Sequence, residues 1–297
     1  MGTESVTGSD LVIKSAFDFD PKNPQPGMYA GVPDTAYFAS RATNHSTLTA
    51  MMQSPAHFRV KRDAKEHKES DAMRLGSVAH MMLFEPDRVA DATIPPPFNP
   101  RTNEPYGSET KAWAQYVSEN PGKLIVTPAE WEASQAMVEA INKNGIMSPV
   151  FRAAQYNELV VVWYERGVLC KAKIDALVPG VMAADLKTTL DAAERPFAAK
   201  VQSLSYYTQA AFYLMACESV GMKNVDFMFA VVEKEPPYGT NTYLMGQKFR
   251  MIGRSRVHEW LGMVEQCQAS GNWPCYPEKL IELEPDTWFL AKFTDGM

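Results

Sequence analysis

The stretch KAKIDALVPGVMAADLKTTLDA, residues 171–192, contains two apolar runs that are separated by Pro179-Gly180, and each run carries one carboxylate. Side chains alternate between the two faces of a strand, which places Asp185 and Lys187 on the same face. If the two runs pair as a hairpin about Pro179-Gly180, Asp175 and Asp185 become near neighbours across the strands. The pattern therefore predicts two carboxylates and a lysine gathered on one sheet.

Two carboxylates at this separation repel each other and raise each other's pKa unless a cation neutralises them. Mg²⁺ suits this position because it takes oxygen ligands and keeps waters for a substrate phosphate. Lys187 would then orient the attacking water or stabilise developing negative charge. A solvated sheet face is the alternative, since an Asp and a Lys alternating on a strand usually point to solvent. The apolar residues around both aspartates favour a buried site.

The remainder of the chain predicts a mixed α/β fold. Strands are expected within 158–189, at 225–234 and at 241–249, and helices at 46–55, 72–84, 109–119, 128–144, 203–219 and 250–269. Residues 91–109 are expected to form a loop. We expect an irregular N-terminal arm at 1–45 and a single domain at 46–297, made of a helical part (46–155), an α/β core (156–275) and a tail (276–297).

Bulk composition excludes several classes of protein. The 297 residues are 45% hydrophobic and 22% charged, with a net charge of −6, which argues against a generic basic nucleic-acid coat but not against a local basic channel. No membrane span or signal-peptide core is expected. The four cysteines form no CxxC pair, so we expect reduced thiols. No GxxxxGK[ST] loop is present, so no ATP-driven motor is expected.

Several sequence blocks resemble a known family. ELVVVWYERGVLCKAKIDAL followed by AADLKTT, with QAAFY (209–213) behind them, resembles the core of the PD-(D/E)xK nuclease superfamily, and most closely the RecE-type exonucleases (exonuclease VIII) of its RecB-like branch. SPAHF (54–58), LGSVAHMMLFEP (75–86) and FAVVEKEPPY (229–238) resemble the flanking blocks of that family. The resemblance spans roughly residues 45–275. It implies a restriction-endonuclease-like α/β core, with a mixed central sheet flanked by helices.

The resemblance also implies a catalytic site. Its metal ligands would be His80, Asp175, Asp185 and the backbone carbonyl of Leu186, with Glu158 a further candidate, and its catalytic residues would be Asp175, Asp185, Lys187 and His80. Taken alone, His80 is more often a satisfied helix histidine, and Glu158 is as well explained by solvation. Mg²⁺ is the implied ion, and Mn²⁺ is expected to substitute. No cysteine precedes Cys170, so the iron–sulfur cluster of some RecB-like nucleases is not expected.

The resemblance implies contacts to DNA as well. The candidates are Gln209, Tyr213, Arg74, Thr188 and Thr189. Helix packing is the alternative for the Gln209–Tyr213 pair, and strand propensity is the alternative for the two threonines. The charged run from Arg59 to Lys68 is most often a solvated face, but Arg59, Lys61 and Arg62 would also suit a DNA path.

The implied function is that of a Mg²⁺-dependent exodeoxyribonuclease on linear double-stranded DNA, acting 5′→3′ and preparing single strands for homologous recombination. The resemblance further implies a homo-oligomeric ring, double-stranded DNA ends as substrate, a RecT-like single-strand annealing partner, a phage origin and the cytoplasm of a bacterial host. Two alternatives stay open. One is an endonuclease or a single-strand nuclease with the same core, and the other is a catalytically inactive DNA-binding protein.

Overall fold

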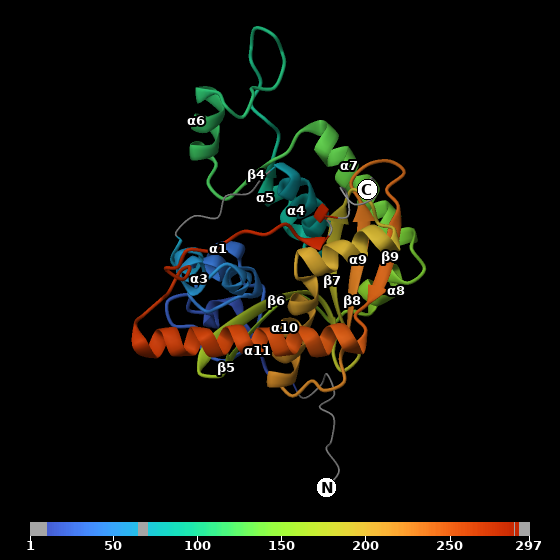
Figure 1. The fold of residues 1–297 in the computed structure, drawn as a ribbon. Helices are drawn as coiled ribbons and strands as arrows, with labels where there is room; N and C mark the ends of the chain where they lie inside the picture. Colours follow the sequence, from blue (N-terminus) through green and yellow to red (C-terminus); the bar gives the residue numbers. More distant parts are fainter. Residues whose placement is uncertain (1–10, 65–70, 288, 291–297) are drawn as a thin grey trace.

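The computed structural model describes residues 11–64, 71–287 and 289–290 of the chain, and the side chains of 71–73 lie outside this description. A seven-stranded mixed sheet forms its centre (Figure 1). In spatial order its strands are β1 (Ile13–Ser15), β2 (Gly27–Ala30), β5 (Tyr156–Glu165), β6 (Val168–Val178), β7 (Met182–Thr189), β8 (Asp226–Glu233) and β9 (Thr240–Leu244). The β1–β2 and β7–β8 pairs are parallel and the others antiparallel.

Helices account for most of the remaining described chain. They are α1 (Asp34–Ala39), α2 (His45–Leu48), α3 (Pro55–Asp63), α4 (Asp71–Phe84), α5 (Val89–Ala92), α6 (Lys111–Glu119), α7 (Pro128–Lys143), α8 (Met147–Ala153), α9 (Glu194–Ser203), α10 (Tyr206–Ser219) and α11 (Gln247–Ser270). A small parallel pair, β3 (Thr93–Ile94) and β4 (Leu124–Ile125), lies at the base of a projection that carries α6 (Figure 1). No helix in the described ranges is both long and apolar enough to cross a membrane.

The hairpin expected about Pro179-Gly180 is present. β6 and β7 pair antiparallel with Val178 opposite Met182 and Ala176 opposite Ala184. Gly180 has φ +69°, a left-handed conformation that glycine adopts without steric cost. The paired register ends at Ala176–Ala184, one position before the two aspartates, so the carboxylates lie where the two strands begin to separate.

Helices cover both faces of the sheet, as the sequence pattern predicted. On one face α9, α10 and α11 bury Phe197, Phe212 and Trp260 against strand residues such as Phe229. On the other face α4 and α7 bury Ala79, Phe84, Met137 and Ile141 against Ala184, Leu186 and Met228. Each apolar face contributes about 25 cal/mol for every Å² removed from water, so the helices are fixed by burial rather than by local propensity. The mixed sheet flanked by helices confirms the predicted fold class.

The N-terminal arm expected at 1–45 is not irregular where the structure describes it. β1 and β2 extend the sheet beside β5, and α1 packs over that end. Phe19, Tyr29 and Tyr37 form a separate apolar cluster with Val160 and Val162. Tertiary burial explains this difference, because the two strands are too short to show a periodic pattern. Residues 1–10 of the expected arm lie outside the described residues, as do residue 288 and residues 291–297 of the expected tail.

Other boundaries differ locally from expectation. Pro55 opens α3 instead of ending the preceding helix, since Ser54 caps α3 by accepting a hydrogen bond from the amide of His57. α9 was not expected, and it carries Pro196 in its first turn, where proline is tolerated. The strand expected at 241–249 ends at Leu244, and α11 begins at Gln247.

Candidate active site

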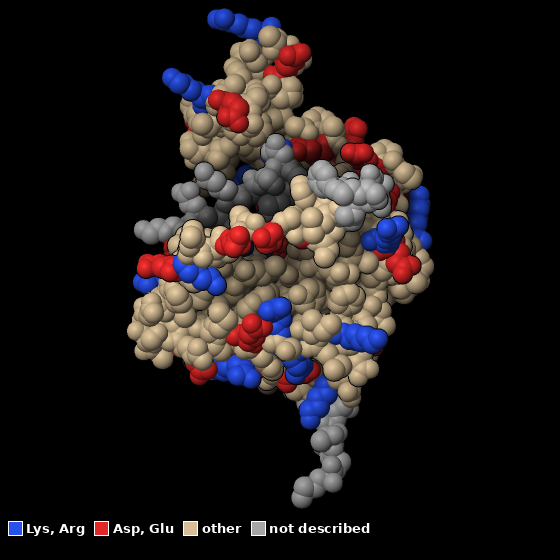
Figure 2. Space-filling view, in the orientation of Figure 1, with Lys and Arg blue, Asp and Glu red and all other residues tan. Residues whose placement is uncertain are grey.

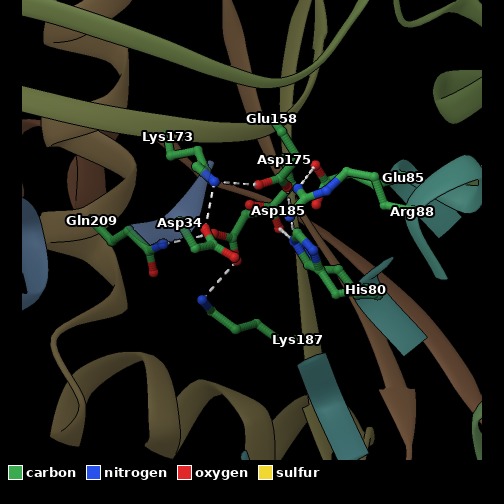
Figure 3. A network of polar contacts seen from close by, with 11 residues as sticks. Asp34, His80, Glu85, Arg88, Glu158, Lys173, Asp175, Asp185, Lys187 and Gln209 are labelled. Carbon is green, nitrogen blue, oxygen red and sulfur yellow. Dashed lines mark hydrogen bonds and ion pairs between the residues drawn. The ribbon is translucent and has the colours of Figure 1, made fainter. Parts of the chain in front are cut away.

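The separation of β6 and β7 opens the sheet at Asp175 and Asp185 (Figure 3). Asp175 Oδ2 accepts a hydrogen bond of 2.8 Å from the amide of Leu186, which would otherwise lack a strand partner at this point. Both aspartates are buried, at 8% and 2% exposure. The strand geometry alone therefore brings the two carboxylates into one pocket.

His80 enters this pocket from α4. Its Nε2 lies 2.9 Å from Asp175 Oδ2 and 3.4 Å from Glu158 Oε1. Gly76, one turn earlier on the same helix face, lets α4 approach β7 closely, since a Cβ at Gly76 would lie 3.0 Å from Thr188 Oγ1. The close approach at Gly76 therefore also fixes where α4 places His80.

Glu158 comes from β5 through an unusual backbone conformation. In the β5–β6 register it lies between the pairs Asn157–Ala176 and Leu159–Ile174, opposite Asp175, yet it does not join the ladder. Its φ is +53°, a left-handed value that is costly for a residue with a Cβ. Such outliers are typical of functional sites, where the surrounding fold enforces them. Its carboxylate lies 3.3 Å from Lys173 Nζ.

Lys187 occupies the opposite side of the pocket, facing α10 (Figure 3). Its ammonium lies 2.7 Å from Asp185 Oδ2 and over the rings of Tyr206 and Phe229, 4.7 and 5.6 Å from their centroids. Gln209 of α10 donates a 2.6 Å hydrogen bond to the other oxygen of Asp185. Asp185 is therefore held by a cation and an amide, and Lys187 by a carboxylate and two aromatic rings.

The charges of the pocket shift several pKa values in the metal-free protein. Burial alone lowers the pKa of His80, but the carboxylates of Asp175 and Glu158 outweigh it and raise this pKa to about 9. Burial raises the pKa of Glu158 to about 7 against the opposing effect of His80, and burial raises that of Asp185 to about 6 against the opposing effect of Lys187. For Asp175, burial is outweighed by His80, and the pKa is lowered. These opposing shifts mark the pocket as a candidate catalytic site.

The donor atoms of the pocket suit a divalent cation. Among the described residues, His80, Glu158 and Asp175 form a group whose ligand atoms lie within 4.8 Å of one another. Two carboxylate oxygens, Glu158 Oε1 and Asp185 Oδ2, are buried without a well-directed hydrogen bond among the described residues. His80 Nε2 lies 3.4 Å from the first and Lys187 Nζ 2.7 Å from the second, and a divalent cation would satisfy such buried oxygens as well. Carboxylate oxygens are the ligands that Mg²⁺ prefers. Glu158, which the sequence left as a further candidate, thus joins the compact group, whereas Asp185 is engaged by Lys187 and Gln209.

The remaining predicted residues lie in different surroundings. Thr188 faces Gly76 of α4, and the hydroxyl of Thr189 is used within the fold, donating to the carbonyl of Asp191 and accepting from Lys200. Arg74 donates from Nε and Nη2 to one oxygen, Oε1, of Glu130, and this ion pair ties α4 to α7.

Of the α10 candidates, Gln209 reaches Asp185 directly. The ring of Tyr213 packs edge-on against Phe227, and its hydroxyl is hydrogen-bonded to the side chain of Gln209. The backbone amide of Leu186 donates to Asp175. The role of the Leu186 carbonyl as a metal ligand stays a prediction. The DNA contacts of Arg74, Thr188, Thr189 and Tyr213 also stay predictions.

Sequence reasoning missed several members of the network. Lys173 bridges Glu158 and Asp34, and its Nζ lies 2.6 Å from Asp34 Oδ1 (Figure 3). Asp34 begins α1, within the segment expected to be irregular, and no sequence signal connects it to β6 across 139 positions. Tyr206 had a weak signal, because QSLSY (202–206) has the same Gln-to-Tyr spacing as QAAFY (209–213). Lys173 had a signal, since it precedes Asp175 by two positions and shares its strand face.

Comparisons with known proteins give the family and a similar fold. A family described as "PDDEXK-like domain of unknown function (DUF3799)" matches residues 44–283. A crystal structure from Eubacterium rectale, described as "Putative exonuclease", is similar with a TM-score of 0.56 and 15% identity, over 86% of this chain and 94% of that chain. At this identity the likeness concerns the fold alone. A search of curated proteins gives no match. Because the family match covers most of its length, the chain belongs to the PDDEXK-like domain family.

Proposed function

We propose that this protein is a divalent-metal-dependent exodeoxyribonuclease that hydrolyses linear double-stranded DNA. The observation that carries the proposal is the convergence of His80, Glu158, Asp175, Asp185 and Lys187 where β6 and β7 separate. The PDDEXK-like family and the fold shared with a protein described as an exonuclease support nuclease chemistry. Mg²⁺ is the proposed ion, with Mn²⁺ as a substitute.

Each side chain has a distinct task in this proposal. A divalent cation, when bound, activates water and neutralises phosphate charge. His80, Glu158 and Asp175 would hold the cation, with Asp185 adjoining it. Asp185 raises the pKa of Lys187 although burial opposes it, so Lys187 remains an ammonium ion. Such a cation is suited to orient the attacking water and to stabilise the negative charge that develops on the phosphate.

The finer features of the proposal rest on the RecE-type sequence blocks. They are 5′→3′ polarity, a homo-oligomeric ring around DNA, a RecT-like single-strand annealing partner, a role in recombination, and a phage-encoded protein acting in the bacterial cytoplasm. A ring would explain how a chain of net charge −6 stays on DNA, because a protein that encircles the duplex is held there without a net electrostatic attraction.

The test is cleavage of end-labelled linear duplex beside a covalently closed circle, with Mg²⁺ or with EDTA. We expect metal-dependent loss of the linear DNA alone, and the position of the label gives the polarity. Cleavage of the circle would replace the proposal by an endonuclease. Absence of cleavage with any metal would leave a DNA-binding protein.

Two substitutions connect the activity to the site. Asp185→Ala and Lys187→Ala are expected to abolish cleavage with the fold retained, as judged by circular dichroism. Lys143→Ala serves as the control, since the Lys143 side chain is 73% exposed and pairs with Glu139 one turn away. Normal activity in either site variant would overturn the assignment.

A further inference from the structure

Helix α3 is locally basic in an acidic protein. It carries Arg59, Lys61 and Arg62 against one acid, Asp63, in a chain of net charge −6. The Arg59 side chain is 53% exposed. Charges of both signs are interspersed between wide uncharged areas on the face drawn in Figure 2. A local excess of cations is the feature by which a protein attracts phosphates.

Helix α3 is fixed relative to the candidate site. Lys61 Nζ donates a hydrogen bond to the carbonyl of Ser46 in α2. The neighbouring His45 Nε2 lies 2.8 Å from Thr208 Oγ1 of α10. The next residue of α10, Gln209, donates to Asp185. Three hydrogen bonds, linked through residues that are neighbours in sequence, therefore connect α3 to the carboxylate of Asp185.

The cations of α3 have cationic neighbours in other elements. After burial, the charges of Lys187 and Lys61 lower the pKa of His45, so both ammonium groups lie near this buried ring. Arg59 and Arg62 form ion pairs with Asp63, and the charge of Arg41 also lowers the pKa of Asp63. Arg41 therefore lies near the two arginines of α3.

A distant segment supports the arginines of α3. Trp273, just after α11, stacks on Phe58 and lies beneath Arg59 and Arg62, whose guanidinium carbons are 5.9 and 5.0 Å from its ring centroid. The amide of Ala56 donates to the carbonyl of Pro274 and fixes this segment. Arg62 donates from Nε and Nη2 to Asp63, and its side chain is 18% exposed. Arg59 is the more exposed of the two, and a guanidinium group stacked on an aromatic ring is suited to binding phosphate.

The arginines of α11 provide a contrast. Arg250, Arg254 and Arg256 pair one-to-one with carboxylates, namely Asp226, Glu218 and Glu259. Their positive charges are locally cancelled. On α3, both arginines share the single carboxylate of Asp63. Charge balance therefore distinguishes the α3 surface from the other arginine-rich helix.

We propose that Arg41, Arg59, Lys61 and Arg62 form a track that binds the phosphate backbone of a DNA strand and leads it to Lys187. The inference rests on the proposed nuclease function and names the path of its substrate. Contacts of this kind are made to phosphates rather than to base edges, so binding by the track is insensitive to sequence and sensitive to salt.

The experiment measures binding of a fluorescein-labelled blunt duplex of about 30 base pairs in EDTA, at several salt concentrations. The test variant is Arg41→Gln with Arg59→Gln. The matched control is Lys143→Gln with Arg256→Gln, which removes the same charge elsewhere on the surface. The slope of the logarithm of the association constant against the logarithm of the salt concentration is negative. We expect its magnitude to decrease by about 2 in the test variant and to stay unchanged in the control.

Equal slopes for the wild type, the test variant and the control would overturn the track. An equal loss in both variants would also overturn it, since net charge alone would then explain binding. If the test variant melts at a lower temperature, Lys61→Gln is measured instead, with an expected slope change of about 1. A wild type that binds through α3 without cleaving DNA contradicts the proposed function while supporting the track, so the two failures are distinguishable.

Discussion

Lys187 has its ammonium group between the carboxylate of Asp185 and the faces of two aromatic rings. Phe229 lies beside Asp185 in the parallel β7–β8 register, whereas Tyr206 is the first residue of α10. The carboxylate fixes the charge, and the rings restrict the direction of the side chain. Tyr206 is therefore a positioning residue for Lys187.

We expect Tyr206→Leu to lower kcat for DNA cleavage by about tenfold, because a cation–π contact contributes about 0.5–2 kcal/mol. Tyr206→Phe keeps the ring and should retain most of the activity. The measurement is kcat and KM on linear duplex for both variants. A rise in KM at constant kcat in Tyr206→Leu would instead assign Tyr206 to substrate binding.

Glu158 shows that the site stores backbone strain. Its left-handed φ of +53° turns the side chain toward His80 and Lys173, and a residue with a Cβ is disfavoured there by about 1–2 kcal/mol. Glycine does not incur this cost. We expect Glu158→Gly to be more stable than Glu158→Ala by about 1 kcal/mol, although both lose the carboxylate.

Urea unfolding in EDTA gives the two stabilities, and cleavage assays give the activities. Both variants should lose most metal-dependent cleavage, because each removes a candidate ligand. If Glu158→Ala proves as stable as Glu158→Gly, the left-handed conformation is not a source of strain.

At the scale of elements, the site depends on how closely α4 approaches β7. Gly76→Ala would place a methyl group 3.0 Å from Thr188 Oγ1, so α4 or Thr188 must move by a few tenths of an ångström. His80 lies one turn along the same helix face and would move with it. We expect Gly76→Ala to lower cleavage activity, although alanine favours the helix by about 1 kcal/mol.

The double variant Gly76→Ala with Thr188→Ala should recover activity, since it removes the hydroxyl that the new methyl group meets. Thr188→Ala alone tests the predicted phosphate contact of this threonine. Weaker DNA binding in that variant would support the contact, and unchanged binding would leave Thr188 as a packing partner of α4. Absence of recovery in the double variant would contradict the close-approach argument.

The elements that carry the main ligands were predictable, because local pattern determines them. The turn at Pro179-Gly180 sets the β6–β7 register, and the register places Asp175 and Asp185. The helix expected at 72–84 is observed as α4, Asp71–Phe84, and it carries His80. α9 was not predicted, although its Pro196 lies in the first turn and is compatible with a helix.

At the scale of the whole molecule, the N-terminal segment completes the site. α1 lies before residue 44, where the family match begins, yet Asp34 reaches Lys173 and the carbonyls of Tyr37 and Ser40 accept from the buried ammonium of Lys171. These contacts join residues more than 130 positions apart. Such pairings are set by sheet closure and burial, which explains why no local pattern predicted them. The left-handed conformation of Glu158 was equally invisible, because glycine is the residue that signals it.

The stability of the molecule should depend on pH through a histidine outside the metal pocket. Burial, followed by the charges of Lys187 on β7 and Lys61 on α3, lowers the pKa of His45 to about 3 from an ordinary value of 6.5. Below pH 6.5 the unfolded chain therefore binds a proton at His45 that the folded chain does not. The free energy of unfolding should fall as pH decreases, and the contribution is lost progressively between the two pKa values.

His45→Gln removes this titration and keeps a polar group facing Thr208. Between about pH 7.5 and about pH 5.0, we expect the wild type to lose about 2 kcal/mol of unfolding free energy relative to the variant, at about 1.4 kcal/mol per pH unit below 6.5. Urea unfolding of both proteins in EDTA measures the difference. Glu158 and Asp185, whose raised pKa values act in the opposite direction, are present in both proteins and cancel. Parallel pH profiles would show that His45 is protonated in the folded state, and the buried contact to Thr208 would then have to accommodate a charge.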